Sequence, residues 1–224
     1  MADWNKLILE ERFRPPYPQT AVHSFVITLE KIFTERPLRI WDLCCGGGRH
    51  TVLMSSLGHD VYASDLAPNA LELTRAWLVE ANLSVELAQA DMTVCPWPGI
   101  TFHGIVSWNA LYHNTFSNIK LSIDTVYDCL LPNGLFMGTF KSTNADTYGL
   151  GPEIELNTFI CPDGPEQGQL HCFFDETTIR RLFEGWEFIS LVEQKMKYLE
   201  GGQNFLEYNP FPYTTWCVLV RKKV

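Results

Sequence analysis

A glycine-rich turn is the feature of this sequence with the most evident chemistry. The segment Asp42-Leu43-Cys44-Cys45-Gly46-Gly47-Gly48 follows a short apolar run and precedes an amphipathic stretch. Glycine permits a tight turn and lets a ligand approach the backbone where a Cβ atom would intrude. Free N–H groups at the start of the following helix can meet an anionic group. The turn therefore predicts a site for a nucleotide-like ligand.

Two ligand classes use such a turn, and this sequence favours one of them. A dinucleotide-binding turn needs Gly-x-Gly-x-x-Gly/Ala. Counting from Gly46, the third position is Thr51, which is too large for the close contact of helix and strand. Asp42 would repel a pyrophosphate, whereas it would attract the ammonium group of S-adenosylmethionine. We therefore expect S-adenosyl-L-methionine as cofactor, with S-adenosyl-L-homocysteine as product, and keep NAD-dependent oxidoreduction as the weaker alternative.

Further motifs follow at the ends of the next predicted strands. Asp65 lies 17 residues after Gly48, Asp91-Met92 ends a third strand, and the motif 107–113 follows a fourth. Together with Leu131-Pro132-Asn133-Gly134-Leu135, this order resembles the class I S-adenosylmethionine-dependent methyltransferase superfamily, although Cys44 stands where that family usually has glycine. The resemblance implies that the following residues bind cofactor: Asp42, Cys44, Gly46, Gly48, Asp65, Leu66, Asp91, Met92 and Ser107.

Within that superfamily the sequence is most similar to the tellurite-resistance-like methyltransferases. The similarity rests on Gly-Arg-His-Thr after the glycine turn, on Asp91-Met92-Thr93, and on the stretches 153–159 and 171–174. It implies a small-molecule acceptor methylated on an O, N, S or metalloid atom by in-line displacement. A non-catalytic S-adenosylmethionine-binding protein is the alternative from another class.

The acceptor is expected at the carboxyl ends of the fourth and fifth strands, because the cofactor takes the ends of the first three. Tyr112 and His113 are the catalytic candidates; His113 has a pKa suited to a base, or it packs beneath a neighbouring segment. Glu153 and Glu155 either hold a cationic substrate or are solvated. His171 acts as a base or a metal ligand, but no zinc-ligand spacing surrounds it, so no metal is expected. The substrate-binding candidates are Tyr17, Tyr112, Glu153, Glu155, Asn157 and His171.

The elements that would position these residues alternate along the chain as in a doubly wound α/β fold. We expect a Rossmann-like, seven-stranded, mostly parallel sheet with an antiparallel last strand, in a single domain spanning residues 1–224. The N-terminal arm and helix would cover 1–37, with 12–17 as a lid over the cofactor or a surface arm. A loop-rich, ordered flap would cover the substrate over 142–174. Strands are expected at 38–43, 60–65, 85–90, 102–107, 135–140, 187–196 and 214–221, and helices at 19–34, 49–57, 68–81, 119–130 and from 175.

Composition excludes several classes of function. The 224 residues carry a formal net charge of −9, and the only basic cluster is Arg221-Lys222-Lys223, so a nucleic-acid or anionic-membrane partner is not expected. Neither a leader peptide nor a membrane-spanning run is evident. Seven scattered cysteines match no disulfide framework. These observations predict a cytoplasmic monomer or homodimer that acts on a small molecule.

Overall fold

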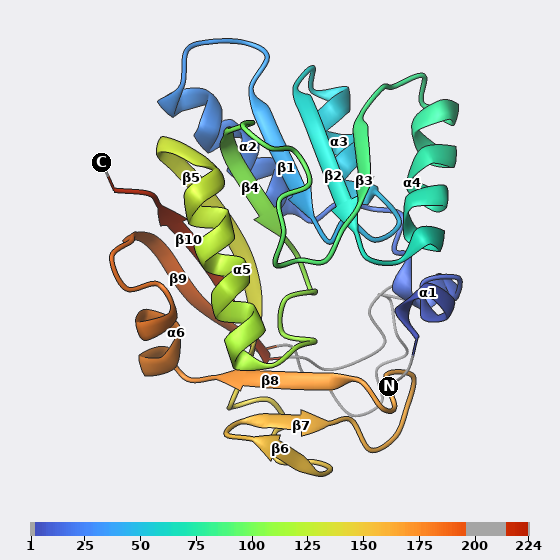
Figure 1. Cartoon of the computed structure of the whole chain (residues 1–224), viewed down its shortest axis with the longest axis vertical. Helices are drawn as coiled ribbons and strands as arrows, with labels where there is room; N and C mark the ends of the chain where they lie inside the picture. The colour runs from blue at the N-terminus through green and yellow to red at the C-terminus, as the bar shows by residue number, and fades with distance from the viewer. Residues whose placement is uncertain (1–2, 196–213, 224) are drawn as a thin grey trace.

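The computed structural model describes residues 3–195 and 214–223. Its sheet has the order β3-β2-β1-β4-β5, with β10 antiparallel to β5 and β9 antiparallel to β10. The strands β1 to β5 run parallel, so their carboxyl ends meet at one end of the sheet, where Figure 1 shows β6, β7, β8 and α1. These seven strands are β1 (Arg39–Leu43), β2 (Asp60–Asp65), β3 (Glu86–Gln89), β4 (Phe102–Ser107), β5 (Leu130–Ser142), β9 (Glu187–Lys195) and β10 (Thr214–Arg221). The doubly wound, mostly parallel sheet is confirmed.

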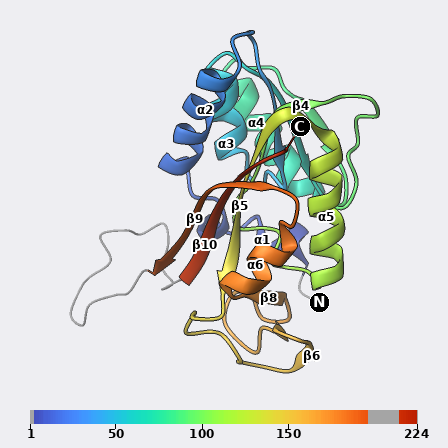
Figure 2. The same cartoon turned by 90° about the vertical axis from the view of Figure 1, so that its left-hand side faces the viewer.

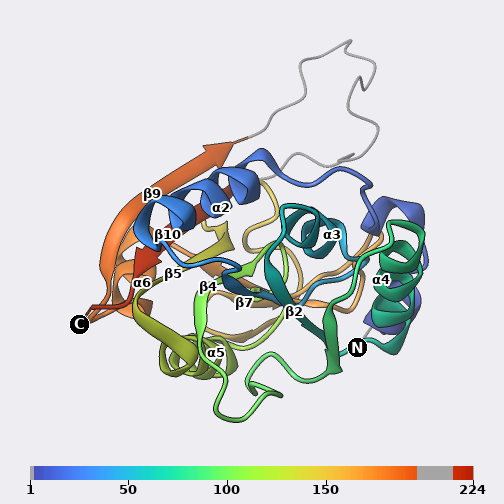
Figure 3. The same ribbon diagram turned by 90° about the horizontal axis from the view of Figure 1, so that it is seen from above.

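Helices cover both faces of this sheet, as Figures 2 and 3 show. The helices α2, α3 and α4 lie on one face, and α5 and α6 lie on the other. Apolar side chains of β1 and β4 fill both interfaces; Ile40 and Val106 pack toward α2, whereas Trp41 and Ile105 pack toward α5. The helices are α2 (Thr20–Ile32), α3 (Arg49–Ser56), α4 (Pro68–Glu80), α5 (Phe116–Cys129) and α6 (Glu176–Leu182).

Local sequence explains where these helices begin. Pro68 occupies the first turn of α4, where its missing N–H costs no hydrogen bond. The Thr115 hydroxyl accepts from the Asn118 N–H at the start of α5, and the Asp175 carboxylate caps α6 through the Thr178 N–H. Helix α5 therefore begins three residues before the expected position, because Thr115 is its N-cap.

The segment Pro132-Asn133-Gly134 corrects one expectation. The helix does end before it, but the chain does not break there, since β5 runs from Leu130 through Gly134 to Ser142. Asn133 has a φ of 65°, and the N–H of Asn133 and the carbonyl of Gly134 both pair with the backbone of Lys222. Pairing with Lys222, which directly follows β10, thus holds this turn-forming sequence within the start of β5.

The flap is more regular than its composition indicates. It contains β6 (Glu153–Glu155), β7 (Thr158–Ile160) and β8 (Leu170–Phe174), which pair antiparallel to one another. Strand β8 also pairs in parallel with the end of β5, where Lys141 stands opposite Phe173. The flap is thereby joined to the carboxyl end of the central sheet rather than suspended over it.

The N-terminal arm comprises the short helix α1 (Trp4–Leu7) and a 3-10 turn, η1 (Glu11–Phe13). The expected final hairpin is present as β9 and β10, while Met196 and the turn-rich segment 199–213 lie outside the described residues. None of the described helices has the length and apolar character needed to cross a membrane.

Candidate active site

The glycine turn and Asp65 form one hydrogen-bonded unit at the carboxyl ends of β1 and β2. The Asp65 carboxylate accepts from the Gly46 N–H and from the Ala67 N–H, each over 2.9 Å. Burial raises the pKa of Asp65, although these backbone N–H groups oppose the rise. A carboxylate held in this way is preorganised to receive the hydroxyl groups of a ribose.

Asp42 lies beneath the turn, almost fully buried. Its Oδ2 atom accepts from the Thr51 hydroxyl over 2.6 Å. Thr51, whose size disfavours a dinucleotide-binding turn, therefore orients the Asp42 carboxyl group. Burial raises the pKa of Asp42 to about 6, with the Thr51 hydrogen bond opposing it. A cation beside Asp42 would lower the pKa of this carboxyl back toward its ordinary value.

Two backbone positions of the turn are conformationally demanding. Gly48 has a φ of +87°, and a Cβ atom there would lie 2.7 Å from the Thr74 hydroxyl oxygen. Cys44 has a φ of 61°, in the left-handed region that glycine adopts with the least strain. The Cys44 thiol is held neutral, because burial and the nearby Asp65 carboxylate raise its pKa.

The remaining cofactor candidates lie along the same edge. Leu66 is 61% exposed beside Asp65, and Asp91 is exposed with its Oδ1 atom accepting from the Thr93 N–H and hydroxyl. Met92 is buried. Ser107 is fully buried at the end of β4, and its hydroxyl has no hydrogen-bond partner among the described residues. An orphaned buried hydroxyl at this edge is what an absent ligand would leave behind.

The N-terminal arm lies against this edge. The Cδ1 atom of Ile8 lies 3.7 Å from where a Cβ atom of Gly46 would be, and Arg14 packs against Gly47. Asn69 donates two hydrogen bonds to Asn5, from its backbone N–H and from its side-chain amide, and these attach α1 to the start of α4. The arm is thus packed on the turn through specific contacts.

A cluster of polar side chains gathers where the acceptor was expected. His113 follows β4, Lys141 ends β5, His171 belongs to β8, and Glu166 comes from the loop before it. The Glu166 Oε2 atom lies 2.9 Å from His171 Nε2 and 3.7 Å from Lys141 Nζ. Lys141 Nζ also lies 3.1 Å from His171 Nδ1 and stands 5.4 Å from the ring centroid of Tyr112. The structure thus brings together the three predicted residues Tyr112, His113 and His171.

Lys141 and Glu166 were not predicted. Lys141 carries a detectable signal, because it directly follows the apolar run 135–140 and so stands at a carboxyl strand end. Glu166 lies in a loop without a motif, and only the pairing of β8 with β5 brings it to the site.

Burial sets the protonation states of this cluster. It lowers the pKa of His113 to about 3 and lowers that of His171, so both rings are neutral at pH 7. Burial also lowers the pKa of Lys141, against the attraction of Glu166. For Glu166 burial acts upward, but the hydrogen bond from His171 and the charge of Lys141 oppose it, and the pKa is lowered. The cluster therefore holds one carboxylate, one ammonium and two neutral imidazoles.

The other substrate candidates lie elsewhere. Tyr17 is 71% exposed, and its carbonyl accepts from the Arg49 guanidinium. The Glu155 carboxylate accepts from the Phe116 N–H and so anchors the flap to the first turn of α5. Glu153 accepts from the Asn157 N–H, and the Asn157 side chain accepts from the Tyr148 hydroxyl. Glu153, Glu155 and Asn157 thus make hydrogen bonds that hold the flap together, and the structure does not bring them into the polar cluster.

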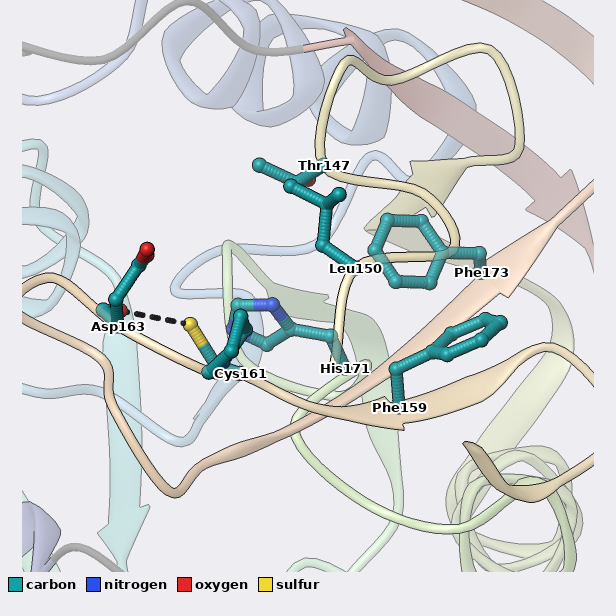
Figure 4. A pocket seen from close by; sticks show the side chains of 8 residues that line it. Thr147, Leu150, Phe159, Cys161, Asp163, His171 and Phe173 are labelled. Carbon is teal, nitrogen blue, oxygen red and sulfur yellow. Dashed lines mark hydrogen bonds between the residues drawn. The ribbon is translucent and has the colours of Figure 1, made fainter. Parts of the chain in front are cut away.

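A small apolar pocket, partly open to solvent, lies beside His171 in the flap. Figure 4 shows His171 between Cys161 and the ring of Phe159, with Thr147 and Leu150 opposite. The Cys161 thiol donates to the Asp163 carbonyl. The pocket is lined by Thr147, Leu150, Phe159, Cys161, Pro162, Asp163, His171 and Phe173.

Comparisons with known proteins agree with this geometry. Residues 40–134 match a family described as a methyltransferase domain. The relatives to which the chain is similar are S-adenosylmethionine-dependent methyltransferases, and S-adenosyl-L-methionine is the cofactor that they support. The chain is related to TehB of Haemophilus influenzae, a probable S-adenosyl-L-methionine-dependent methyltransferase, with 23% identity over 87% of this chain and 61% of TehB. The chain thus spans about three fifths of that relative.

Solved structures show the same fold. The crystal structure of Haemophilus influenzae TehB has a TM-score of 0.64 at 20% identity, covering 92% of this chain and 64% of TehB. A S-adenosylmethionine-dependent methyltransferase from Methanosarcina mazei has a TM-score of 0.70 at 16% identity, covering 88% and 97%. Magnesium protoporphyrin IX methyltransferase from Synechocystis, with bound S-adenosylhomocysteine, has a TM-score of 0.65 at 14% identity, covering 91% and 82%.

Proposed function

We propose that the chain is a methyltransferase that moves a methyl group from S-adenosyl-L-methionine to an O, N, S or metalloid atom of a small molecule by in-line displacement. The observation that carries the proposal is the enclosed polar cluster. The side chains of His113 and His171 are only 7% and 5% exposed, beneath the arm and the flap. Such a site admits a small molecule more readily than a folded macromolecule.

The edge of β1 to β3 fits the cofactor. Asp65 would hold the ribose hydroxyls, Asp42 the ammonium group, and Asp91 with the Met92 N–H the adenine. The glycine turn, with Gly46 and Gly48, would let the cofactor approach the backbone, beside Cys44, Leu66 and Ser107. When bound, the cofactor supplies a methyl group on a sulfonium that is already a good leaving group.

The chain's own residues would then align the acceptor and exclude water. Tyr112 and His113, after β4, stand at the end of the sheet next to the cofactor edge. Trp4 of the arm packs on the His113 ring, with 4.7 Å between the ring centroids, so the arm covers both halves of the site. His171 is the member of the cluster contributed by the flap.

Calorimetry and labelled turnover test this proposal. S-adenosylmethionine and S-adenosylhomocysteine should bind and stabilise the chain, and NAD should not. Methyl-labelled cofactor should then pass its label to a small molecule from a panel of thiols, phenols, amines and metalloid oxyanions. Binding of NAD alone would refute the proposal. Binding of S-adenosylmethionine without transfer of label to any member of the panel would indicate a non-catalytic binding protein.

A further inference from the structure

The hydrogen bonds of the polar cluster fix where its protons lie. His113 Nδ1 stands 3.3 Å from the Leu170 carbonyl, which can only accept, so Nδ1 carries the proton. The Glu166 carboxylate can only accept, so His171 Nε2 carries the proton that it donates to Glu166 Oε2. Lys141 Nζ lies 3.1 Å from His171 Nδ1 and 3.4 Å from Nε2, and since Nε2 is protonated, Lys141 donates to Nδ1. Each of these three contacts pairs one donor with one acceptor.

This assignment leaves two acceptors facing each other. In a neutral His113 the Nε2 atom presents a lone pair, and it lies 3.8 Å from Glu166 Oε1. Among the hydrogen bonds of the described residues, none places a donor between these two atoms. The burial that keeps His113 neutral is consistent with this assignment. Two facing acceptors call for a hydrogen-bond donor supplied from outside the chain.

We infer that the acceptor atom arrives with its proton, as a thiol or a hydroxyl, and donates that proton into the gap between His113 Nε2 and Glu166 Oε1. This inference rests on the proposed function and narrows its substrate class. A metalloid oxyanion such as tellurite would bring negative charge against a carboxylate and a lone pair. The charges of Lys141 and Glu166 match each other, so the cluster has no net positive charge to attract an anion.

The chemistry of the transfer agrees with a thiol or a hydroxyl. The acceptor's sulfur or oxygen forms a bond to the methyl carbon as the cofactor's bond from sulfur to methyl breaks, and that electron pair remains on the cofactor's sulfur. The S–H or O–H proton of the acceptor moves to His113 Nε2. The imidazolium so formed faces the Glu166 carboxylate, which stabilises it.

An alkylamine does not fit this arrangement. Because its pKa is about 10, it arrives as an ammonium ion and has to lose a proton before its nitrogen can attack, and a weakly basic His113 does not take a proton from so weak an acid. A methylated thiol or hydroxyl that kept its proton would be a strong acid. Even a weakly basic His113 would therefore accept that proton. Glu166 acts through His113, so it is a positioning residue, and His171 with Lys141 holds its carboxylate in place.

Nitrogen-15 NMR of histidine-labelled protein at pH 7 tests the assignment directly. We expect His113 to be protonated on Nδ1 alone, and an Nε2–H signal would overturn the inference. In Glu166→Gln the carboxamide can donate into the gap, so the His113 Nε2 resonance should shift to that of a hydrogen-bonded acceptor; Glu184→Gln, at an exposed site, is the control. The inference would also be overturned if turnover required zinc or manganese bound to His113, Glu166 and His171, because the metal ion would then fill the gap.

Labelled turnover in a deproteinised cell extract, supplemented with thiols, phenols, amines and tellurite, tests the substrate class. We expect label on sulfur or oxygen of a small molecule. His113→Ala should lower its rate about 10²–10⁴-fold at unchanged cofactor affinity, while the exposed-site control His23→Ala has no effect. Label on nitrogen or tellurium would refute the inference but leave the proposed function standing. Transfer to none of the small molecules would refute the proposed function itself.

Discussion

The two halves of the site are built by different means. At the ends of β1 and β2 the proposed cofactor-binding groups lie in or shortly after the glycine turn, and backbone N–H groups of Gly46 and Ala67 hold the Asp65 carboxylate. At the ends of β4 and β5, side chains from four separate segments hold one another: His113, Lys141, Glu166 and His171. The first half is a property of local backbone geometry, and the second depends on tertiary packing. Substitutions in the two halves should therefore fail in different ways.

The largest effect on stability is expected at Lys141. Lys141→Met removes the buried cation and leaves the Glu166 carboxylate paired through His171 alone, which should destabilise the fold by about 3 kcal/mol. Glu166 retains some exposure, so we expect the lower end of the usual range. Chemical denaturation of Lys141→Met and of the unmodified chain measures the effect.

The matched control is the double variant Lys141→Met/Glu166→Gln, which removes both charges. It should recover more than half of the loss, because neither charge is left unpaired. Additive losses would show that the two side chains do not depend on each other, and the contrast between the halves would weaken.

Asp65→Ala should act on cofactor affinity instead. Two hydrogen bonds from hydroxyls to a carboxylate contribute together about 3 kcal/mol, so the dissociation constant of S-adenosylhomocysteine should rise about 100-fold. Calorimetry on Asp65→Ala and on Asp60→Ala, an exposed carboxylate at the start of the same strand, separates this effect from net charge. Equal affinities for the two variants would contradict the ribose-binding role.

A pair of glycine substitutions compares the two halves directly. Gly48 and Gly149 both have positive φ, at +87° and +77°, but only at Gly48 would a Cβ atom meet a neighbour, Thr74. Gly149→Ala should cost about 1 kcal/mol from backbone strain, and Gly48→Ala about 2 kcal/mol or more. Thermal unfolding measures both, and a cost at Gly149 equal to that at Gly48 would refute the close contact as the cause.

The smallest effect is a pH dependence at Asp42. Because its pKa is raised to about 6 without cofactor, lowering the pH from 7 to 5 should weaken S-adenosylmethionine binding about tenfold. Asp42→Asn should bind weakly with a flat profile. Without cofactor the sign is opposite: the native state binds the proton more tightly than the unfolded chain, so stability falls as pH rises from about 4 to about 6. A flat affinity profile in the unmodified chain would remove Asp42 from the ammonium site.

The sequence predicts where the glycine turn and its neighbouring carboxylates lie, because the determinants of their positions are local. Asp42, Gly48 and Asp65 stand at strand ends that apolar runs and glycine turns mark, and the mostly parallel sheet follows from the alternation of elements. The acceptor half was predicted only in part. Glu166 reaches Lys141 because β8 pairs with β5, and neither the composition of the flap nor its period indicates strands. The break expected at residues 132–134 was wrong for the same reason, because backbone pairing with Lys222 overrides the local preference of these residues for a turn.

A crystal structure with S-adenosylhomocysteine tests the account most directly, because it shows whether the two halves meet at one reacting centre. We predict that the ribose hydroxyls bind Asp65 and that the sulfur faces the gap between His113 Nε2 and Glu166 Oε1. A cofactor bound at Asp65 with its sulfur directed away from His113 would contradict the account.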